Sequence, residues 1–412
     1  MSDQNNSVFE QRVASLRELL DQNDLDALIV SHDDEYLSYE LNEDEERLKY
    51  ITGFSGSAGY AVITCNDLKI NEENIEINQD NTENGIVVDR DCAVFVDGRY
   101  VVQVKEQIDS DIFQDFDLAK VKPAKWISSV MPKNSTVGID INCVSYEEYI
   151  SIKNELGMNN INLVATENNL VDKIWTDKPA SVISEISIFP DEYNGCPSPQ
   201  KRQLIAQTLR DKDLDATVIC DPESICWLLN IRGKDRAYLP VINCKMVAYS
   251  NEALEWYINP NHFKDENLQD QLQEHIGHID IFPEEAFDDV LDRLCSSSCT
   301  VYVDPETTNA HVMTKLYSGG AKVSEGLGLC QMPKACKNHI EVAGEYKAHI
   351  KDGIAMCRFI SWLDNLTALD KPTDSDETFL RRVEGVDEAE LAARALSFRK
   401  VEAGFIEPSF AT

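Results

Sequence analysis

The sequence predicts an α/β protein with two similar units in tandem, followed by the opening helices of a third region. Short apolar runs alternate with amphipathic helical segments up to about residue 330, which is typical of mixed α/β sheets. One succession of helix, strand, glycine turn and strand occurs twice. From about residue 333 onward, long helical patterns replace the alternation. A chain of 412 residues is long enough for two or three domains.

The first unit begins with an amphipathic helix over 8–22, in which apolar residues recur at spacings of four, three and four: Phe9, Val13, Leu16 and Leu20. A buried strand is predicted over 26–30. Residues 33–46 contain eight of the 14 acidic residues found among the first 50. We expect this acidic segment to be an exposed loop with some helix, because carboxylates are ordinarily solvated.

A glycine-rich stretch over 50–64, YITGFSGSAGYAVIT, is the most distinctive feature of this unit. Glycine tolerates positive φ and close backbone approach, so the stretch predicts a turn that leads into a buried strand. It lacks the lysine and Ser/Thr of a P-loop and matches no dinucleotide fingerprint, so a structural turn is favoured over a phosphate site. A second strand over 92–96 ends at an Asp-Gly turn, which places Arg99 at the mouth of the sheet.

The remainder of the first unit continues the alternation. Residues 71–84 are rich in Asn and Glu and are predicted to be a loop insertion. Helices are predicted over 100–108 and 145–156, with a strand over 137–140 between them. Together these elements form one mixed α/β sheet unit.

The same pattern then repeats. A helix over 201–212 leads into DLDATVI at 213–219, which parallels DLDALIV at 24–30. WLLNIRG at 227–233 parallels YITGFSG at 50–56. The two motifs are farther apart in the first copy, and the acidic segment accounts for the additional length. Strands over 247–249, 256–258 and 301–304 and a helix over 284–295 complete the second copy. The two copies are predicted to join near 179–199.

The third region begins near residue 333. Asn338 followed by Glu341 is typical of a capping box at a helix start. The helix extends to about 366 with one apolar face formed by Tyr346, Ile350, Ile354 and Cys357. Asp387 starts a second helix. Two helices without a sheet do not make a self-sufficient domain, so we expect these faces to lack a partner within the chain.

Composition excludes several classes of function. The net charge of −35 argues against nucleic acid or an anionic membrane as a partner. The polar start and the lack of an apolar run of 18 residues favour a cytoplasmic protein without a signal peptide. The twelve cysteines are scattered through apolar runs, and most are expected to be small buried hydrophobic residues. Cys295 and Cys299 form a close pair, but no second cysteine pair or histidine cluster supports a metal or redox site there.

Histidines give no metal site either. His275 and His278 have no nearby third ligand. His349 lies on the helix that opens the third region, where a satisfied or exposed side chain is expected. Hydrolysis of a peptide bond needs a nucleophile and charge stabilisation, and no residue of this chain can be named for either role.

Several motifs taken together resemble cytosolic Xaa-Pro aminopeptidase (aminopeptidase P). They are ITGFSGSAG at 51–59, VDGRY at 96–100, NLVDKIWTDKP at 169–179 and DPESICWLLNIRG at 221–233, with AHIKDG at 348–353. The resemblance implies two creatinase-like domains over 1–178 and 179–332, followed by the incomplete start of a pita-bread catalytic domain over 333–412.

In that family the catalytic domain removes an N-terminal residue that precedes proline. Two divalent ions, commonly manganese, activate water there, and two Asp, one His and two Glu hold them. The family's ligands lie beyond the counterpart of residues 409–412, so the resemblance implies no metal ligand and no catalytic residue in this chain. We therefore expect the chain to be inactive alone.

Arg99 is the one functional position that the resemblance assigns here. The matching arginine of the family extends from the first domain toward the bound peptide, so Arg99 is expected to bind substrate. Xaa-Pro peptides are the implied partners if a catalytic domain is supplied, and a dimer through the family-type interface is also implied. Two alternatives stay open: a binding module that docks on a full-length or complementary catalytic chain, and a regulatory pseudoenzyme.

Overall fold

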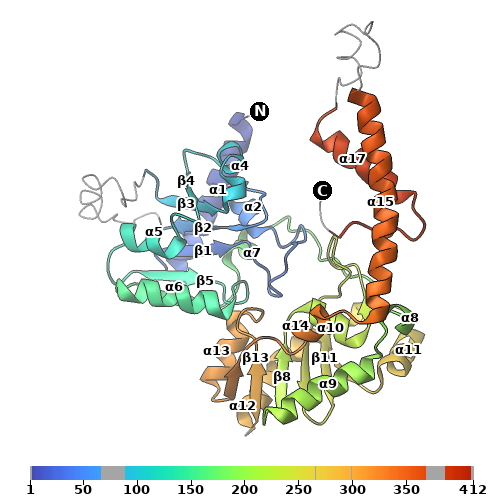
Figure 1. Ribbon diagram of the computed structural model, residues 1–412. Coiled ribbons are helices and arrows are strands. Elements are labelled where there is room, and N and C mark those ends of the chain that lie inside the picture. Colours follow the sequence, from blue (N-terminus) through green and yellow to red (C-terminus); the bar gives the residue numbers. More distant parts are fainter. Residues whose placement is uncertain (1, 66–88, 265, 298, 368–385, 410–412) are drawn as a thin grey trace, which may run out of the picture.

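Two sheet-containing units and a pair of long helices make up the computed structural model (Figure 1). The structure describes residues 2–65, 89–264, 266–297, 299–367 and 386–409. The loop insertion predicted at 71–84 lies outside these residues. In Figure 1 the first unit is blue to teal, the second is green to orange, and the two long helices are red.

The first unit is a six-stranded sheet covered by helices. In chain order its elements are α1 (Ser2–Gln22), β1 (Ala27–Ser31), α2 (Arg47–Thr52), β2 (Gly59–Thr64), β3 (Cys92–Val96), η1 (Gly98–Tyr100), α4 (Gln103–Gln107), β4 (Phe113–Asp117), α5 (Pro123–Val130), β5 (Thr136–Ile139), α6 (Tyr146–Met158), β6 (Asn162–Ala165) and α7 (Leu170–Ile174). The strand order is β4-β3-β2-β1-β5-β6. The predicted strand at 92–96 is confirmed. The helix predicted over 100–108 is confined to α4, because the chain first forms the 3-10 turn η1 and a further turn.

The second unit has the same construction. Its elements are β7 (Ser187–Ile188), α8 (Asp191–Asn194), α9 (Ser198–Asp211), β8 (Ala216–Ile219), α10 (Pro222–Leu229), β9 (Ile231–Arg232), β10 (Cys244–Tyr249), β11 (Leu254–Ile258), η2 (Pro260–His262), α11 (Glu266–Ile276), β12 (Asp280–Phe282), η3 (Glu284–Ala286), α12 (Phe287–Ser296), β13 (Thr300–Val303), α13 (Ala310–Ser318) and β14 (Lys322–Glu325). β7 and β9 form a separate small antiparallel pair.

The predicted duplication is confirmed by the two large sheets. The second sheet has the order β12-β11-β10-β8-β13-β14, which is the order of the first sheet element by element. The first strand of each large sheet, β1 or β8, pairs antiparallel with the second strand of that sheet and parallel with the fifth. The residues before these first strands also agree, since Asp24 and Asp213 occupy the same place in the repeat and both have left-handed backbone, with φ of 53° and 55°.

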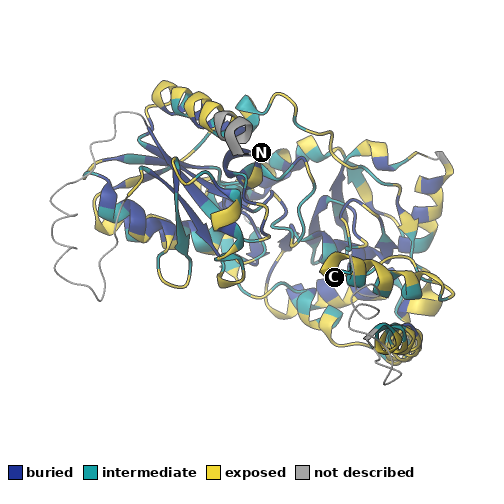
Figure 2. Ribbon diagram, turned by 90° about the horizontal axis from the view of Figure 1, so that it is seen from above, coloured by how far each residue is buried: buried dark blue, intermediate teal, exposed yellow. Residues whose placement is uncertain are grey.

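Each sheet lies between two apolar clusters, one on either face. Figure 2 shows the strands of both units as the most continuously buried parts of the chain. In β3 all five residues are buried. Burial on both faces explains why the central strands are continuous apolar runs without polar alternation.

The third region consists of α14 (Gln331–Ala335), α15 (His339–Thr367) and α17 (Glu388–Lys400). The capping box is confirmed: Asn338 Oδ1 accepts from the Glu341 amide at 3.1 Å, and the Asn338 amide donates to Glu341 Oε2 at 2.8 Å. Ile350 on the predicted apolar face is 64% exposed. The assignment of this region to a pita-bread domain and the boundaries at 178 and 332 stay predictions.

Candidate functional site

The glycine-rich stretch is a tightly packed turn. Gly53 ends α2 with a φ of 84°, in the left-handed region. A Cβ at Gly56 would lie 2.2 Å from the ring of Phe54, and one at Gly59 would lie 2.6 Å from the carbonyl oxygen of Phe95. Side chains are therefore excluded here by the protein itself. This packing explains why glycine occupies these positions, so a bound phosphate is not needed to explain them.

Arg99 lies in η1, directly after β3, where the sequence predicted it. Asp97 caps this turn by accepting from the Arg99 amide at 3.0 Å, and it also accepts from Arg99 Nε at 2.7 Å. The hydrogen bond to Asp97 raises the pKa of Arg99. The Arg99 side chain is 58% exposed. Within the described part of the chain its two terminal nitrogens make no hydrogen bond, so they can donate to an incoming acceptor.

Aromatic and hydroxyl groups border this arginine. The guanidinium of Arg99 lies 5.0 Å from the centre of the Tyr100 ring. The hydroxyl of Tyr100 is 2.6 Å from that of Ser57, in the glycine-rich turn. The turn and the end of β3 thus form one small surface with hydrogen-bonding groups and an aromatic face.

The two units meet through equivalent segments, which follow β5 in the first sheet and β13 in the second. Ser145 and Asn309 are the N-cap residues of α6 and α13, and they form an antiparallel β-bridge with each other. Next to this bridge the rings of Tyr146 and Tyr317 stack with centroids 5.7 Å apart. Each residue follows the fifth strand of its own sheet. Equivalent N-cap residues of the two copies therefore contact each other at this bridge.

The prediction of an exposed, partly helical acidic segment at 33–46 is wrong. Residues 33–46 contain turns and no helix, and they lie between the two units. Asp34 is only 1% exposed, and Tyr36 and Asp44 are also buried. The physical reason is that two cations of the second unit, Arg236 and Lys245, bind the carboxylates of this segment. Arg236 and Lys245 are distant from this segment in the sequence, so local sequence patterns could not predict these ion pairs.

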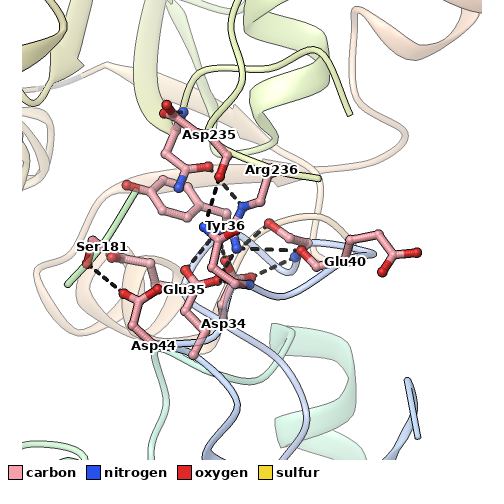
Figure 3. A network of polar contacts seen from close by, with 12 residues as sticks. Asp34, Glu35, Tyr36, Glu40, Asp44, Ser181, Asp235 and Arg236 are labelled. Carbon is pink, nitrogen blue, oxygen red and sulfur yellow. Dashed lines mark hydrogen bonds and ion pairs between the residues drawn. The ribbon is translucent and has the colours of Figure 1, made fainter. Parts of the chain in front are cut away.

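Arg236 is the centre of this contact (Figure 3). Its guanidinium binds the carboxylates of Asp34 and Glu45, with a distance of 2.9 Å between Nη2 and Glu45 Oε1. Its Nε donates to Asn243 Oδ1 at 3.1 Å. Burial disfavours the charge of Arg236, but the two carboxylates outweigh this and raise its pKa. A fully hydrogen-bonded arrangement of this kind is what a buried charge requires.

Lys245 makes the second ionic contact. Its Nζ lies 2.7 Å from Glu35 Oε2 and 3.3 Å from Glu284 Oε1. The hydroxyl of Tyr36 donates to Glu284. Burial opposes the charge of Lys245, and Glu35 and Glu284 together raise its pKa. A cavity of about 330 Å³ borders this group, and both units line it.

No described group of residues fits the two divalent ions that the resemblance implies. Among the described residues there is no set of three or more His, Cys, Asp or Glu side chains placed to hold a metal. His278 and His349 are exposed and lie against single carboxylates, at 3.4 Å from Asp280 and 3.7 Å from Glu345. We therefore derive no catalytic step through a metal from these residues.

Comparison with known proteins gives the relationship. Two models of the creatinase/prolidase N-terminal domain match the chain, one over residues 12–73 and one over residues 177–341. The Xaa-Pro aminopeptidase ApepP of Drosophila melanogaster is 28% identical over 98% of this chain and 60% of its own length. A probable Xaa-Pro aminopeptidase P of Talaromyces marneffei is 29% identical over 92% of this chain and 54% of its own length.

The chain is similar in sequence to Xaa-Pro aminopeptidases of several organisms. The crystal structure of an X-prolyl aminopeptidase from Caenorhabditis elegans, described as a cytosolic enzyme with a di-nuclear active site, has the same fold, with a TM-score of 0.80 over 98% of this chain. It is 22% identical, and the match covers 61% of that enzyme. The chain thus spans about 54–61% of the length of these relatives.

The two matched creatinase-type segments coincide with parts of the two duplicated units. The mixed α/β fold predicted from the alternating pattern is confirmed by the two sheets and by the fold shared with the Caenorhabditis elegans enzyme. Among the described residues, no helix is long and apolar enough to cross a membrane.

Proposed function

We propose that this chain takes part in the metal-dependent removal of an N-terminal residue that precedes proline. Its homology to Xaa-Pro aminopeptidases over nearly its whole length supports the reaction class. In this proposal the protein is cytoplasmic, its substrates are Xaa-Pro peptides, and two divalent ions, commonly manganese, supply the activated water. A dimer of the family type belongs to the same proposal.

The ligands for these ions are proposed to lie outside the described residues, in the greater part of a pita-bread domain that begins at about residue 333. The 412-residue chain by itself is accordingly proposed to be inactive.

The orientation of the Arg99 side chain supports a substrate-binding role for the first unit. Its side chain is fixed by Asp97 through Nε, which leaves the terminal nitrogens directed to other acceptors. A guanidinium oriented in this way suits a peptide carbonyl or a terminal carboxylate, because charged N–H donors bind such oxygens strongly. Arg99 is proposed to bind the peptide and to take no part in the bond-breaking step.

A chimera tests this proposal. The chain would be fused to the remainder of the Drosophila relative, and release of the first residue from an Xaa-Pro peptide would be measured with Mn²⁺. We expect activity from the chimera and none from the 412-residue chain. Arg99→Ala should raise KM by about tenfold with a smaller change in kcat, since it removes binding to the peptide.

Arg90→Ala is the matched control, because Arg90 is an exposed arginine near the opposite end of β3 that pairs with Asp111. It should leave both constants unchanged. Metal-dependent release by the unfused chain would refute the proposed inactivity. An active chimera that is indifferent to Arg99→Ala would refute the role of Arg99.

The exposed apolar face of α15 supports a second candidate, a binding module. Tyr346, Ile350 and Ile354 on this helix are exposed. Such a face fits docking on a full-length or complementary catalytic chain. Co-purification of the tagged chain from its own cells tests this: a stoichiometric Xaa-Pro aminopeptidase partner supports the module. A monodisperse chain without a partner and without activity in the chimera would favour a regulatory pseudoenzyme instead.

A further inference from the structure

Residues 33–46, here called the acidic strap, contain eight acidic residues and no lysine or arginine. The strap leaves the first sheet after β1 and lies against the second unit (Figure 3). The corresponding connection of the second unit, between β8 and α10, has only two residues. Since the rest of the duplicated pattern agrees, the strap is an addition specific to the first copy.

Two carboxylates of the strap have a double role. Asp34 and Glu45 both bind Arg236 of the second unit. Asp34 Oδ1 also accepts from the amide of Ser38 at 2.7 Å, and Glu45 Oε2 accepts from the amide of Asn42 at 2.9 Å. Arg236 therefore holds the same carboxylates that fix the internal turns of the strap.

The strap also makes neutral contacts with the second unit. Asn42 Nδ2 donates to the carbonyl oxygen of Asp235 at 2.9 Å. Asn309 Nδ2 donates to the carbonyl oxygen of Glu35 at 2.8 Å. Ser181, in the connection between the units, donates to Asp44 at 2.6 Å. The strap is thus attached along most of its length.

Charge explains why these attachments depend on one another. Like charges repel, and eight carboxylates in 14 residues do not pack together unless cations lie among them. Arg236 and Lys245 supply those cations, and both belong to the second unit. Without Arg236, the buried carboxylate of Asp34 and the partly buried carboxylate of Glu45 would lose their shared cation.

The strap adds contacts to the bridge between Ser145 and Asn309, with its tyrosine stack. The strap and the bridge are adjacent at Asn309, which also donates to the carbonyl oxygen of Glu35. The ion pairs of Arg236 involve other residues of the strap, Asp34 and Glu45. These additional contacts restrict rotation of the first unit about the bridge.

The third region is attached to the second unit. Asn338, at the start of α15, donates through Nδ2 to the carbonyl oxygen of Asn194 at 2.7 Å. Lys334 of α14 lies 3.5 Å from Asp221. Arg99, in contrast, belongs to the first unit. The orientation of the first unit on the second consequently determines where Arg99 lies relative to the third region.

We propose that the acidic strap is an interdomain clamp and that Arg236 is a positioning residue, which acts through the strap to set the place of Arg99. The clamp stands on the contacts above. Its consequence for peptide binding rests on the proposed function. Arg236 itself is buried in the interface and is not proposed to touch the peptide.

The clamp is tested on the chain as it exists by hydrogen exchange. In Arg236→Gln we expect the amides of Ser38 and Asn42 to exchange at least about tenfold faster, while the amides of β3 and β11 keep their protection. Arg293→Gln is the matched control, because Arg293 pairs with Glu255 inside the second unit. It should not alter exchange in the strap.

A second variant guards against general destabilisation. Asp34→Asn with Glu45→Gln and Arg236→Met removes the charges without leaving unpaired carboxylates, and it should also free the strap. Arg236→Lys should restore part of the protection. Unchanged exchange at residues 38 and 42 in both the single and the triple variant would overturn the clamp.

The positioning role is tested in the chimera described above. Arg236→Gln should raise KM with a smaller effect on kcat, and it should add nothing to the effect of Arg99→Ala, because both changes remove the same binding. Additive effects, or an unchanged KM, would overturn the positioning role. If the unmodified chimera is inactive, the proposed function fails, and the hydrogen-exchange result still decides whether the clamp exists.

Discussion

Gly53 and Asn230 occupy the same position in the two copies of the duplicated unit. Each ends a short helix with left-handed backbone, at φ of 84° and 53°. Asparagine and glycine are the residues that adopt this conformation most readily. The surroundings differ, however: the Asn230 side chain accepts from Lys201, whereas at Gly53 a Cβ would lie 2.9 Å from the carbonyl oxygen of Gln107.

Gly53→Ala is expected to destabilise the protein by about 1–3 kcal/mol, since an alanine at positive φ costs about 1 kcal/mol or more and its methyl group would also collide with neighbouring atoms. Denaturant unfolding measures this change. Gly98→Ala is the control, because no atom lies within 4 Å of a Cβ there. Equal effects of the two substitutions would contradict the packing argument.

Most of the central helices and strands can be predicted from the sequence, because the spacing of their apolar residues indicates which side chains are buried. The strand at 92–96 and the helix around Leu16 and Leu20 are patterns of apolar residues that local reasoning detects. β4 was missed, because its sequence FQDFD at the sheet edge is half-buried and mostly polar.

The residues of the candidate site likewise include some that local sequence patterns predict and some that they do not. The position of Arg99 follows from the Asp-Gly turn beside it, and this was predicted. The buried strap was not predicted, because its burial depends on Arg236 and Lys245. The aromatic residues of the segment give no consistent local signal, since Tyr36 is buried whereas Tyr39 is 68% exposed.

Asp33 supplies a prediction about pH. Burial, together with the nearby carboxylates of Glu148 and Asp34, raises its pKa to about 7. The folded state therefore holds a proton that the unfolded chain releases at about pH 4. Stability from this group is complete below about pH 4 and is lost as the pH rises to about 7.

Asp33→Asn should remove this loss of folding stability at higher pH, because asparagine does not ionise. We expect the variant to be more stable than the parent at pH 8, by a few kcal/mol at most, since one pKa unit corresponds to about 1.4 kcal/mol. The difference should disappear at about pH 4. Thermal unfolding across this range measures it, with Glu192→Gln as an exposed-carboxylate control. A parent protein that is the more stable of the two at pH 8 would rule the explanation out.

Lys201 is a buried cation that holds the end of α10. Its Nζ donates to the carbonyl oxygen of Trp227 at 2.8 Å and to Asn230 Oδ1 at 2.6 Å. Burial lowers its pKa to about 8. Lys201→Met should destabilise the protein by about 1–3 kcal/mol, because two acceptors lose their donor. Lys125→Met, at an exposed helix position, should have no effect in the same denaturant titration, and a loss equal to that of Lys201→Met would count against this role.

The apolar face of α15 gives a prediction about association. Ile350 and Ile354 are exposed on this helix, and a cavity of about 760 Å³ lies along the same face. Exposed apolar patches of this kind favour association. We expect light scattering to show a concentration-dependent increase in mass for the 412-residue chain.

Ile350→Glu together with Ile354→Glu should abolish this increase, because carboxylates resist desolvation in an apolar contact. Ala348→Glu is the matched control: it adds a negative charge to the same helix, but on the opposite side, given about 3.6 residues per turn. It should leave the association intact. If all variants and the parent remain monomeric at every concentration, the face is not associating, and the binding-module alternative then depends on a partner other than a second copy of this chain.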